Sequence, residues 1–383
     1  MAGSAAGLAL SRVAASGGHA VSSGFLRLTD SAMKWTLACL VALLPAAFSC
    51  AAQVPMPGDD GMDAGQAARL QAAQAAVGSW YTRVADALAA SGKARDLAFA
   101  ATLLEGAGQD AAAAPPGGDA PSQAVRRDPR VGKWRQLASA RAGSDVVANV
   151  LLLQGDDAAD ATVRKQALAR WRKLEPDNLA PRLHAGGAVG DWLPQAGRDA
   201  RLDQHYYEQL RWMQAALAAH PPGADELELF GGDDLPDDAA AAVAAAGILA
   251  AVAAPALQPL MDACRGDALD ATPTRRADCR QVARVAADTA DTSADTMAGI
   301  GRLQATAATP GEQADARERR RRLDWQMLEW GRIAGSQPDG GAAQFARLLR
   351  DPAVRSERDL VERVLAEARV PAQPPAGWQA PRR

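Results

Sequence analysis

Apolar residues along this chain recur at helical spacing over most of its length. Between residues 144 and 153, valine and leucine form a wide apolar stripe, and between 159 and 174 Val163, Ala167 and Trp171 fall on one side of a helix. The alternation of β-branched residues that marks strands is missing. The pattern therefore predicts an all-α protein with negligible strand.

Capping residues mark where several helices should begin. Asp128 followed by Pro129 is an N-cap with proline at the first helical position. Residues 309–312, Thr-Pro-Gly-Glu, form a capping box that predicts a long helix through Ile333. Repeated Asp-Thr pairs in residues 288–296 predict a break or an exposed turn. Other helices are expected over residues 65–77, 79–91, 96–104, 201–219 and 236–254, from 272 onward and from 356 onward.

Two stretches rich in proline divide the chain. Residues 106–121 also contain much glycine and lack apolar periodicity, so we expect a linker there. This linker would separate N-terminal helices at 64–105 from a helical domain at 122–369. The proline-rich residues 370–383 should form a disordered tail.

Two short segments of the predicted helices are near copies of each other. The sequences KWRQL at 133–137 and RWRKL at 170–174 lie 37 residues apart, a period typical of stacked helical hairpins. Residues 167–178, which end in Glu-Pro-Asp-Asn, resemble the end of a tetratricopeptide repeat, although the Gly and Tyr that follow Trp-x-x-Leu in that family are missing. This resemblance covers about a sixth of the chain. It implies a solenoid of antiparallel helical hairpins that binds peptides or partner proteins.

Residues 33–52 have the three-part layout of a secretory signal peptide. Lys34 supplies the positive end, an apolar run occupies residues 35–48, and small residues follow as far as Ala52. The run is shorter than the ~20 residues that a membrane-spanning helix needs. We therefore expect cleavage after Ala52 and a soluble product in the periplasm or outside the cell. Residues 1–32 would then be disordered or precede a mis-called start.

Lipidation of Cys50 is the alternative fate of this export signal. Cleavage behind Ser49 would make the product a membrane-anchored lipoprotein. Bacterial lipoprotein signals usually carry an aliphatic residue three places before the cysteine and a small residue two places before it. Here Ala47 and Phe48 occupy those places, so soluble export is favoured.

The cysteine count depends on this cleavage. If Cys39 and Cys50 leave with the signal, Cys264 and Cys279 are the only cysteines of the mature chain, in a compartment that oxidises thiols. One pairing exists, so we predict a disulfide that closes the turn-rich loop at 265–278. A pair of inert buried thiols is the alternative.

The charge balance bears on the kind of partner. The chain has 42 basic and 45 acidic residues and a pI near 5.9. Such a balance gives no general attraction to nucleic acid or to anionic lipid. The arginine-rich residues 317–322 lie within helical reach of Asp315 and Asp324, which predicts solvated ion pairs. The acidic residues 225–238 lack the spacing of a calcium loop and should be a solvated loop.

Linear motifs of catalytic or metal chemistry are missing from the sequence. There is no His-Glu-x-x-His, Gly-x-Ser-x-Gly, phosphate loop or Cys-x-x-Cys. His205 and Glu208 stand at i and i+3 on one predicted helix, but a metal site needs three or four ligands and no third is marked. The sequence therefore identifies no catalytic residue, metal ligand or cofactor site.

Two functions from different classes fit these patterns. The first is an exported helical-repeat protein of the bacterial cell envelope that binds a protein or peptide partner, with no nucleic acid and no membrane span after signal removal. The alternative is an exported α-helical hydrolase or lyase whose site assembles from separate residues such as Asp203, His205 and Glu208. A closed pocket with histidine and carboxylates would favour the enzyme, and an open groove lined by Trp, Arg and Leu would favour the binding protein.

Overall fold

The computed structural model of the chain describes residues 64–110, 127–155, 160–230, 235–252 and 257–381. Within these ranges the chain forms sixteen α-helices, one short 3-10 helix and no strand, so the all-α class is confirmed. None of these described helices combines the length and the apolar character needed to cross a membrane. The predicted signal peptide, with Cys50, and the segment before it lie outside the described residues.

Helices α2 (Ala64–Ser91) and α3 (Ala94–Asp110) form a hairpin. Gly92, at φ 67°, makes the turn between them. Two expectations are corrected here, because α2 is one helix rather than two and α3 continues five residues into the predicted linker. Both follow from packing: Gly78 lies against Ala107, where an added Cβ would be 3.7 Å from the Ala107 carbonyl oxygen. This contact between the two helices stabilises the helical conformation of α2 at Gly78 and of α3 beyond residue 105.

Five helices, α4 to α8, follow the hairpin along the chain. Helix α4 (Pro129–Ala142) packs on α3, and the Asp128 side chain accepts a hydrogen bond from the Arg130 main-chain N–H, which confirms the predicted cap. The Asp145 side chain caps α5 by accepting a hydrogen bond from the Ala148 main-chain N–H. The helices that follow α4 are α5 (Val146–Leu151), α6 (Ala161–Leu174), α7 (Ala180–Ala185) and α8 (Val189–Ala196).

The two near-copies at 133–137 and 170–174 are buried to different extents. Trp171 on α6 is fully buried. Its counterpart Trp134 on α4 is only partly buried, and the guanidinium of Arg130 lies 5.5 Å from its ring. Leu174 is exposed at the end of α6. The shared sequence is therefore used in one place as a core anchor and in the other at the edge of the core.

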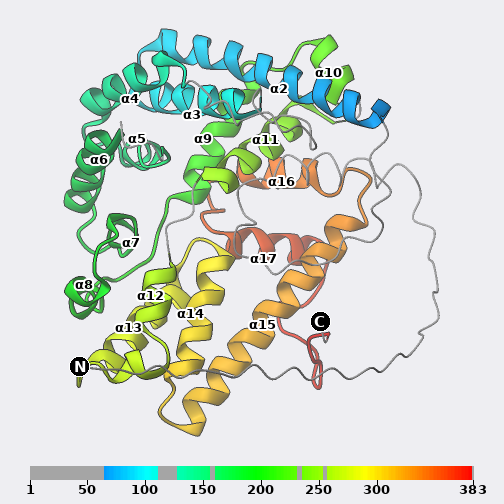
Figure 1. The fold of residues 1–383 in the computed structure, drawn as a ribbon. Helices are drawn as coiled ribbons and strands as arrows, with labels where there is room; N and C mark the ends of the chain where they lie inside the picture. Colours follow the sequence, from blue (N-terminus) through cyan, green and yellow to red (C-terminus); the bar gives the residue numbers. More distant parts are fainter. Residues whose placement is uncertain (1–63, 111–126, 156–159, 231–234, 253–256, 382–383) are drawn as a thin grey trace, which may run out of the picture.

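The middle of the fold joins distant parts of the chain (Figure 1). Helix α11 (Asp237–Val252) packs against both α9 (Tyr206–Ala218) and α16 (Ala342–Leu349), while α10 (Ala224–Phe230) packs on α2. Helix α17 (Glu357–Glu367) contacts α15 (Pro310–Gly335) and α16 and buries Leu360, Val361, Val364 and Leu365. One continuous apolar core runs from α2 to α17.

The remaining helices form a layer on the far side of the molecule from α2 and α3 in the view of Figure 1. They are α12 (Gln258–Ala263), a 3-10 helix (Gly266–Asp270), α13 (Arg275–Thr289), α14 (Ser293–Thr306) and α15 (Pro310–Gly335). The break between α13 and α14 and the capping box of α15 are both confirmed. Helices α13 and α14 approach closely at Gly299, where a Cβ would lie 2.5 Å from the Ala287 nitrogen.

The proline-rich C-terminus differs from its prediction. Residues 370–381 do not form a disordered tail, because they lie along α15. Three side chains of α15 donate hydrogen bonds to main-chain carbonyl oxygens of this segment. These contacts supply the order that the proline-rich composition did not predict.

Candidate functional site

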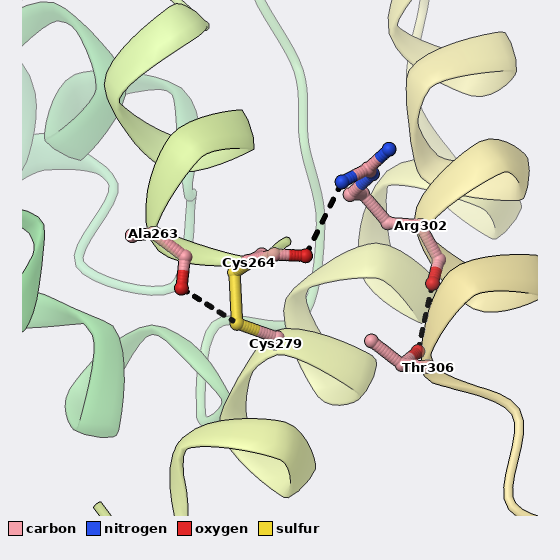
Figure 2. Close-up of a disulfide and its surroundings, with 5 residues drawn as sticks. All are labelled: Ala263, Cys264, Cys279, Arg302 and Thr306. Carbon is pink, nitrogen blue, oxygen red and sulfur yellow. Dashed lines mark hydrogen bonds between the residues drawn. A yellow bond between two sulfur atoms is a disulfide. The ribbon is translucent and has the colours of Figure 1, made fainter. Parts of the chain in front are cut away.

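The predicted cross-link between Cys264 and Cys279 is present (Figure 2). Cys264 follows the end of α12 and Cys279 lies on α13, with their Cα atoms 5.7 Å apart, inside the range of ordinary disulfides. Each residue is 1% exposed. The pairing of these two cysteines is therefore confirmed, and the bond is shielded from solvent.

Polar contacts connect the cross-linked helices to α14 (Figure 2). Arg302 Nη1 donates a hydrogen bond of 3.2 Å to the carbonyl oxygen of Cys264, and Thr306 Oγ1 donates one of 2.7 Å to the carbonyl oxygen of Arg302. The Sγ of Cys279 lies 3.9 Å from the Ala263 oxygen, which is a packing contact because a disulfide sulfur carries no proton. Three helices thus meet at the disulfide.

The structure brings the three candidate residues Asp203, His205 and Glu208 together and adds Glu175. His205 is the N-cap of α9 and has a left-handed backbone at φ 54°, so the expected helix from 201 begins instead at Tyr206. Its Nε2 lies 2.9 Å from Glu175 Oε2 and its Nδ1 lies 3.2 Å from Glu208 Oε2. Asp203 accepts a hydrogen bond from the His205 main-chain N–H. The imidazole is therefore held between two carboxylates.

These carboxylates determine the charge of His205. Burial by itself lowers the pKa of His205, but the hydrogen bonds to Glu175 and Glu208 outweigh it and raise the pKa to about 10. Burial likewise raises the pKa of Glu175, yet hydrogen bonds from His205, Asn178 and Trp171 bring it down to about 2. At neutral pH the group is an imidazolium between two carboxylates. Both ring nitrogens then carry protons, so His205 has no lone pair for general-base catalysis or metal binding.

Glu175 also organises the turn that follows α6. It accepts hydrogen bonds from Trp171 Nε1 at 2.8 Å and from Asn178 Nδ2 at 2.9 Å. Arg201 completes its environment with a salt bridge of 3.0 Å. Asn178 in turn donates to the Asp203 carbonyl and accepts from the Asp203 main-chain N–H. The Glu-Pro-Asp-Asn sequence at 175–178 therefore fastens the end of α6 to the segment before α9.

A second group of acids lies deeper, behind the start of α9. Asp291 accepts hydrogen bonds from the main-chain N–H groups of Gln204 and Tyr206 at 3.1 and 2.8 Å. Burial, together with the neighbouring carboxylate of Asp203, raises the pKa of Asp291 to about 7. The Gln204 side chain donates to Asp295 at 2.8 Å and meets His184 Nε2 at 3.1 Å. Sequence reasoning missed these partners because they lie 20 to 91 residues from Gln204 along the chain.

The histidine–carboxylate cluster does not line the neighbouring cavity. That cavity has a volume of about 530 Å³ and lies beside the 175–178 turn. Its lining residues are Pro176, Asp177, Arg182, Gln195, Arg198 and Asp199. Among the residues that the structure describes, no group of three or more His, Cys, Asp or Glu side chains could hold a metal ion. The charged hydrogen bonds of His205 thus join the end of α6 to the start of α9.

The raised pKa of His205 means that its imidazolium stabilises the folded chain. His205→Asn removes the imidazolium and keeps a residue type that tolerates a left-handed backbone. We expect the free energy of unfolding to fall by about 2 kcal/mol near pH 6, the scale of a hydrogen bond to a charged group. Because the folded-state pKa lies above the ordinary value of 6.5, this contribution is complete below pH 6.5 and disappears as the pH rises toward 10.

Urea unfolding at several pH values measures this effect. Above pH 7 the pH dependence of stability reports on His205, because Asp291, with its pKa of about 7, has largely lost its proton there. The wild type should lose stability between pH 7 and 10 more steeply than His205→Asn, and the two should converge near pH 10. His220→Asn, outside the cluster, is the matched control and should follow the wild type. Parallel curves for His205→Asn and the wild type would contradict the assigned charge.

Comparisons with protein-family models, with curated proteins and with solved structures find no match to this chain.

Proposed function

We propose that this chain is an exported protein of the bacterial cell envelope, periplasmic or secreted, that binds protein or peptide partners. The observation that carries the export proposal is the buried disulfide between Cys264 and Cys279, since such bonds persist in oxidising compartments and are rare in the cytosol. The signal-like residues 33–52 agree with it. Export as a lipoprotein anchored at Cys50 is the alternative form of the same proposal.

The proposed binding role rests on the helical arrangement. Helices that follow one another in sequence pack side by side in α2, α3 and α4 and again in α13, α14 and α15, as in a tetratricopeptide-like array. Outside these consecutive helices, α11 packs on α16, which lies far from it along the chain. Such arrays present extended surfaces to peptides and proteins. The charged state of His205 also favours binding over the hydrolase or lyase alternative, because an imidazolium paired on both sides cannot accept a proton.

Mass spectrometry of the protein from fractionated producing cells tests export. We expect a chain that begins at Gln53, is found outside the cytoplasm and carries no free thiol. An acyl modification on Cys50 would establish the anchored form instead. A mature chain that keeps residues 35–48, or that stays in the cytoplasm with two free thiols, would contradict the proposal.

Cross-linking in intact cells tests the partner class. Purification of the cross-linked protein from the cell envelope should yield a reproducible protein or peptide adduct. The matched control is the same chain without residues 33–52, which would remain in the cytoplasm and should not form that adduct. Equal adducts from both chains would show that the capture is unrelated to the exported state.

A further inference from the structure

The C-terminal segment folds back on the molecule in a defined way (Figure 1). Helix α17 ends in a turn in which the Val370 N–H donates to the Leu365 carbonyl oxygen at 2.9 Å. Arg369 has a left-handed backbone at φ 58°, a conformation that residues other than glycine adopt rarely. This turn directs residues 371–378 along α15.

Three neighbouring side chains of α15 hold the segment by its main chain. Trp325 Nε1 donates to the Pro371 carbonyl oxygen at 2.9 Å. Gln326 Nε2 donates to the Ala372 carbonyl oxygen at 3.2 Å, and Arg321 Nη1 donates to that of Pro375 at 3.3 Å. We call Arg321, Trp325 and Gln326 the α15 ledge. Each of its hydrogen bonds to the segment ends on a main-chain carbonyl oxygen, so none of them selects a ligand side chain.

The ledge is held in place and has an apolar component. Glu318 accepts two hydrogen bonds from Arg321, at Nε and Nη2, which leaves Nη1 directed to the tail. The ring of Trp378 packs edge-on against Trp325 with centroids 5.4 Å apart, and Pro374 is buried. Proline-rich segments dock in grooves lined by aromatic side chains, and here Trp325 supplies both an aromatic ring and an N–H donor.

We propose that the α15 ledge is a binding site for a proline-rich segment of a partner protein, and that the chain's own residues 371–378 occupy this site and keep it closed. The inference rests on the proposed interaction function and names the chemical class of the partner. Proline has no N–H donor, so the hydrogen-bonding groups of a proline-rich main chain are mostly carbonyl oxygens. Carbonyl oxygens are the groups that the ledge binds. The recognition of main chain rather than side chains lets a partner segment of similar composition take the place of the tail.

The attachment of the tail predicts how the site is controlled. A tethered ligand competes at an effective concentration in the millimolar range, so a partner segment binds weakly while the tail is docked. Binding in trans should therefore strengthen when the docking of the tail is weakened and should depend on Trp325.

The test uses the full mature chain and a fluorescent peptide with the sequence of residues 370–381, VPAQPPAGWQAP. Trp378→Ala in the protein removes the ring contact of the tail and leaves the ledge intact. We expect it to bind the peptide at least about tenfold more tightly than the wild type, as measured by fluorescence anisotropy. Trp325→Ala added to Trp378→Ala should abolish that gain. Arg317→Ala, on the same helix and outside the ledge, is the matched control and should bind as the wild type does.

Further measurements keep the outcomes distinct. Circular dichroism must show that each variant retains the helical fold, and a peptide with its prolines changed to alanine should bind less well. If Trp378→Ala gains no affinity, or if Trp325→Ala does not remove the gain, the proposal is overturned. A wild-type dimer that Trp325→Ala abolishes would make the tail of a second copy the occupant and would also overturn it. None of these results alters the mass and cross-linking tests of export and partner binding.

Discussion

Replacement of Arg135 by alanine is expected to lower the free energy of unfolding by about 3–5 kcal/mol, the cost of breaking a buried ion pair from one side. Arg135 on α4 is 1% exposed and pairs with Asp160 and Glu105. Arg127 pairs with the same two acids, so four charged groups form one network at the junction of α3, α4 and α6.

The effect should be large because Asp160 stays charged in the folded chain. Its side chain is 3% exposed. Burial raises the pKa of Asp160, but hydrogen bonds from Arg127 and Arg135 outweigh this and leave the pKa lowered. Without Arg135, the carboxylate has lost one of its two cationic partners and still cannot reach water. The space beside Gly155, which the guanidinium now fills, would also be left empty.

Urea unfolding with matched variants separates this network from ordinary surface pairs. Arg130→Ala removes an arginine of the same helix that is 41% exposed and pairs with Asp86 and Asp128, and it should cost at most about 1 kcal/mol. The double variant Arg135→Ala/Asp160→Ala should lose less stability than its two single variants lose together, because it also removes the buried carboxylate that Arg135→Ala leaves with only one cationic partner. Similar losses for Arg130→Ala and Arg135→Ala would contradict a special role for burial.

Removal of the disulfide gives the second large expected effect. Cys264→Ala/Cys279→Ala should lower the free energy of unfolding by about 3 kcal/mol, the value that the chain-entropy model gives for a loop of about 15 residues. That is a large part of a typical stability of about 5–15 kcal/mol. The bond closes the region that contains the 3-10 helix, whose described residues bury only Leu269, so little else holds the loop.

Thermal unfolding with and without a reductant measures this contribution. The wild type should melt at a lower temperature in the reductant, and the double alanine variant should melt at the same lowered temperature in both conditions. Thiol titration of the denatured, non-reduced wild type is the control for the starting state and should find no free thiol. Two titratable thiols per chain, or a wild-type melting temperature that the reductant does not change, would contradict a stabilising disulfide.

Local chemistry explains what could be predicted about the fold. The caps at Asp128, Thr309 and Ser356 are completed within one helical turn, so the residues that form them are adjacent in sequence. The inward residues of α17 follow from helical periodicity for the same reason. The disulfide could be inferred because one cysteine pair remains after the expected cleavage. In each case the interacting groups, or the number of choices, can be read from the sequence.

The candidate site shows where that reasoning stops. The i, i+3 spacing of His205 and Glu208 is visible in the sequence, but Glu175 lies 30 residues from His205. The contact with Glu175 changes the role that the sequence suggests for His205. Without Glu175 the pair suggests an acid and a base, and with Glu175 the histidine is a partly buried cation between two carboxylates. Asp291 accepts a hydrogen bond from the main-chain N–H of Tyr206, the first residue of α9, and lies 85 residues from it along the chain. No local pattern therefore predicts where α9 begins.

The sequence by itself determined the all-α class, several helix starts, the ion pairs of the arginine-rich run with Asp315 and Asp324, and the cysteine pairing, because these depend on neighbours within a few residues or on a simple count. Tertiary structure alone decided that α2 is continuous through Gly78, that His205 is charged and that residues 370–381 lie along α15. The physical reason is the same in all three. Each depends on the free energy of contacts between segments far apart in the chain, and such contacts override the local preferences of glycine, histidine and proline.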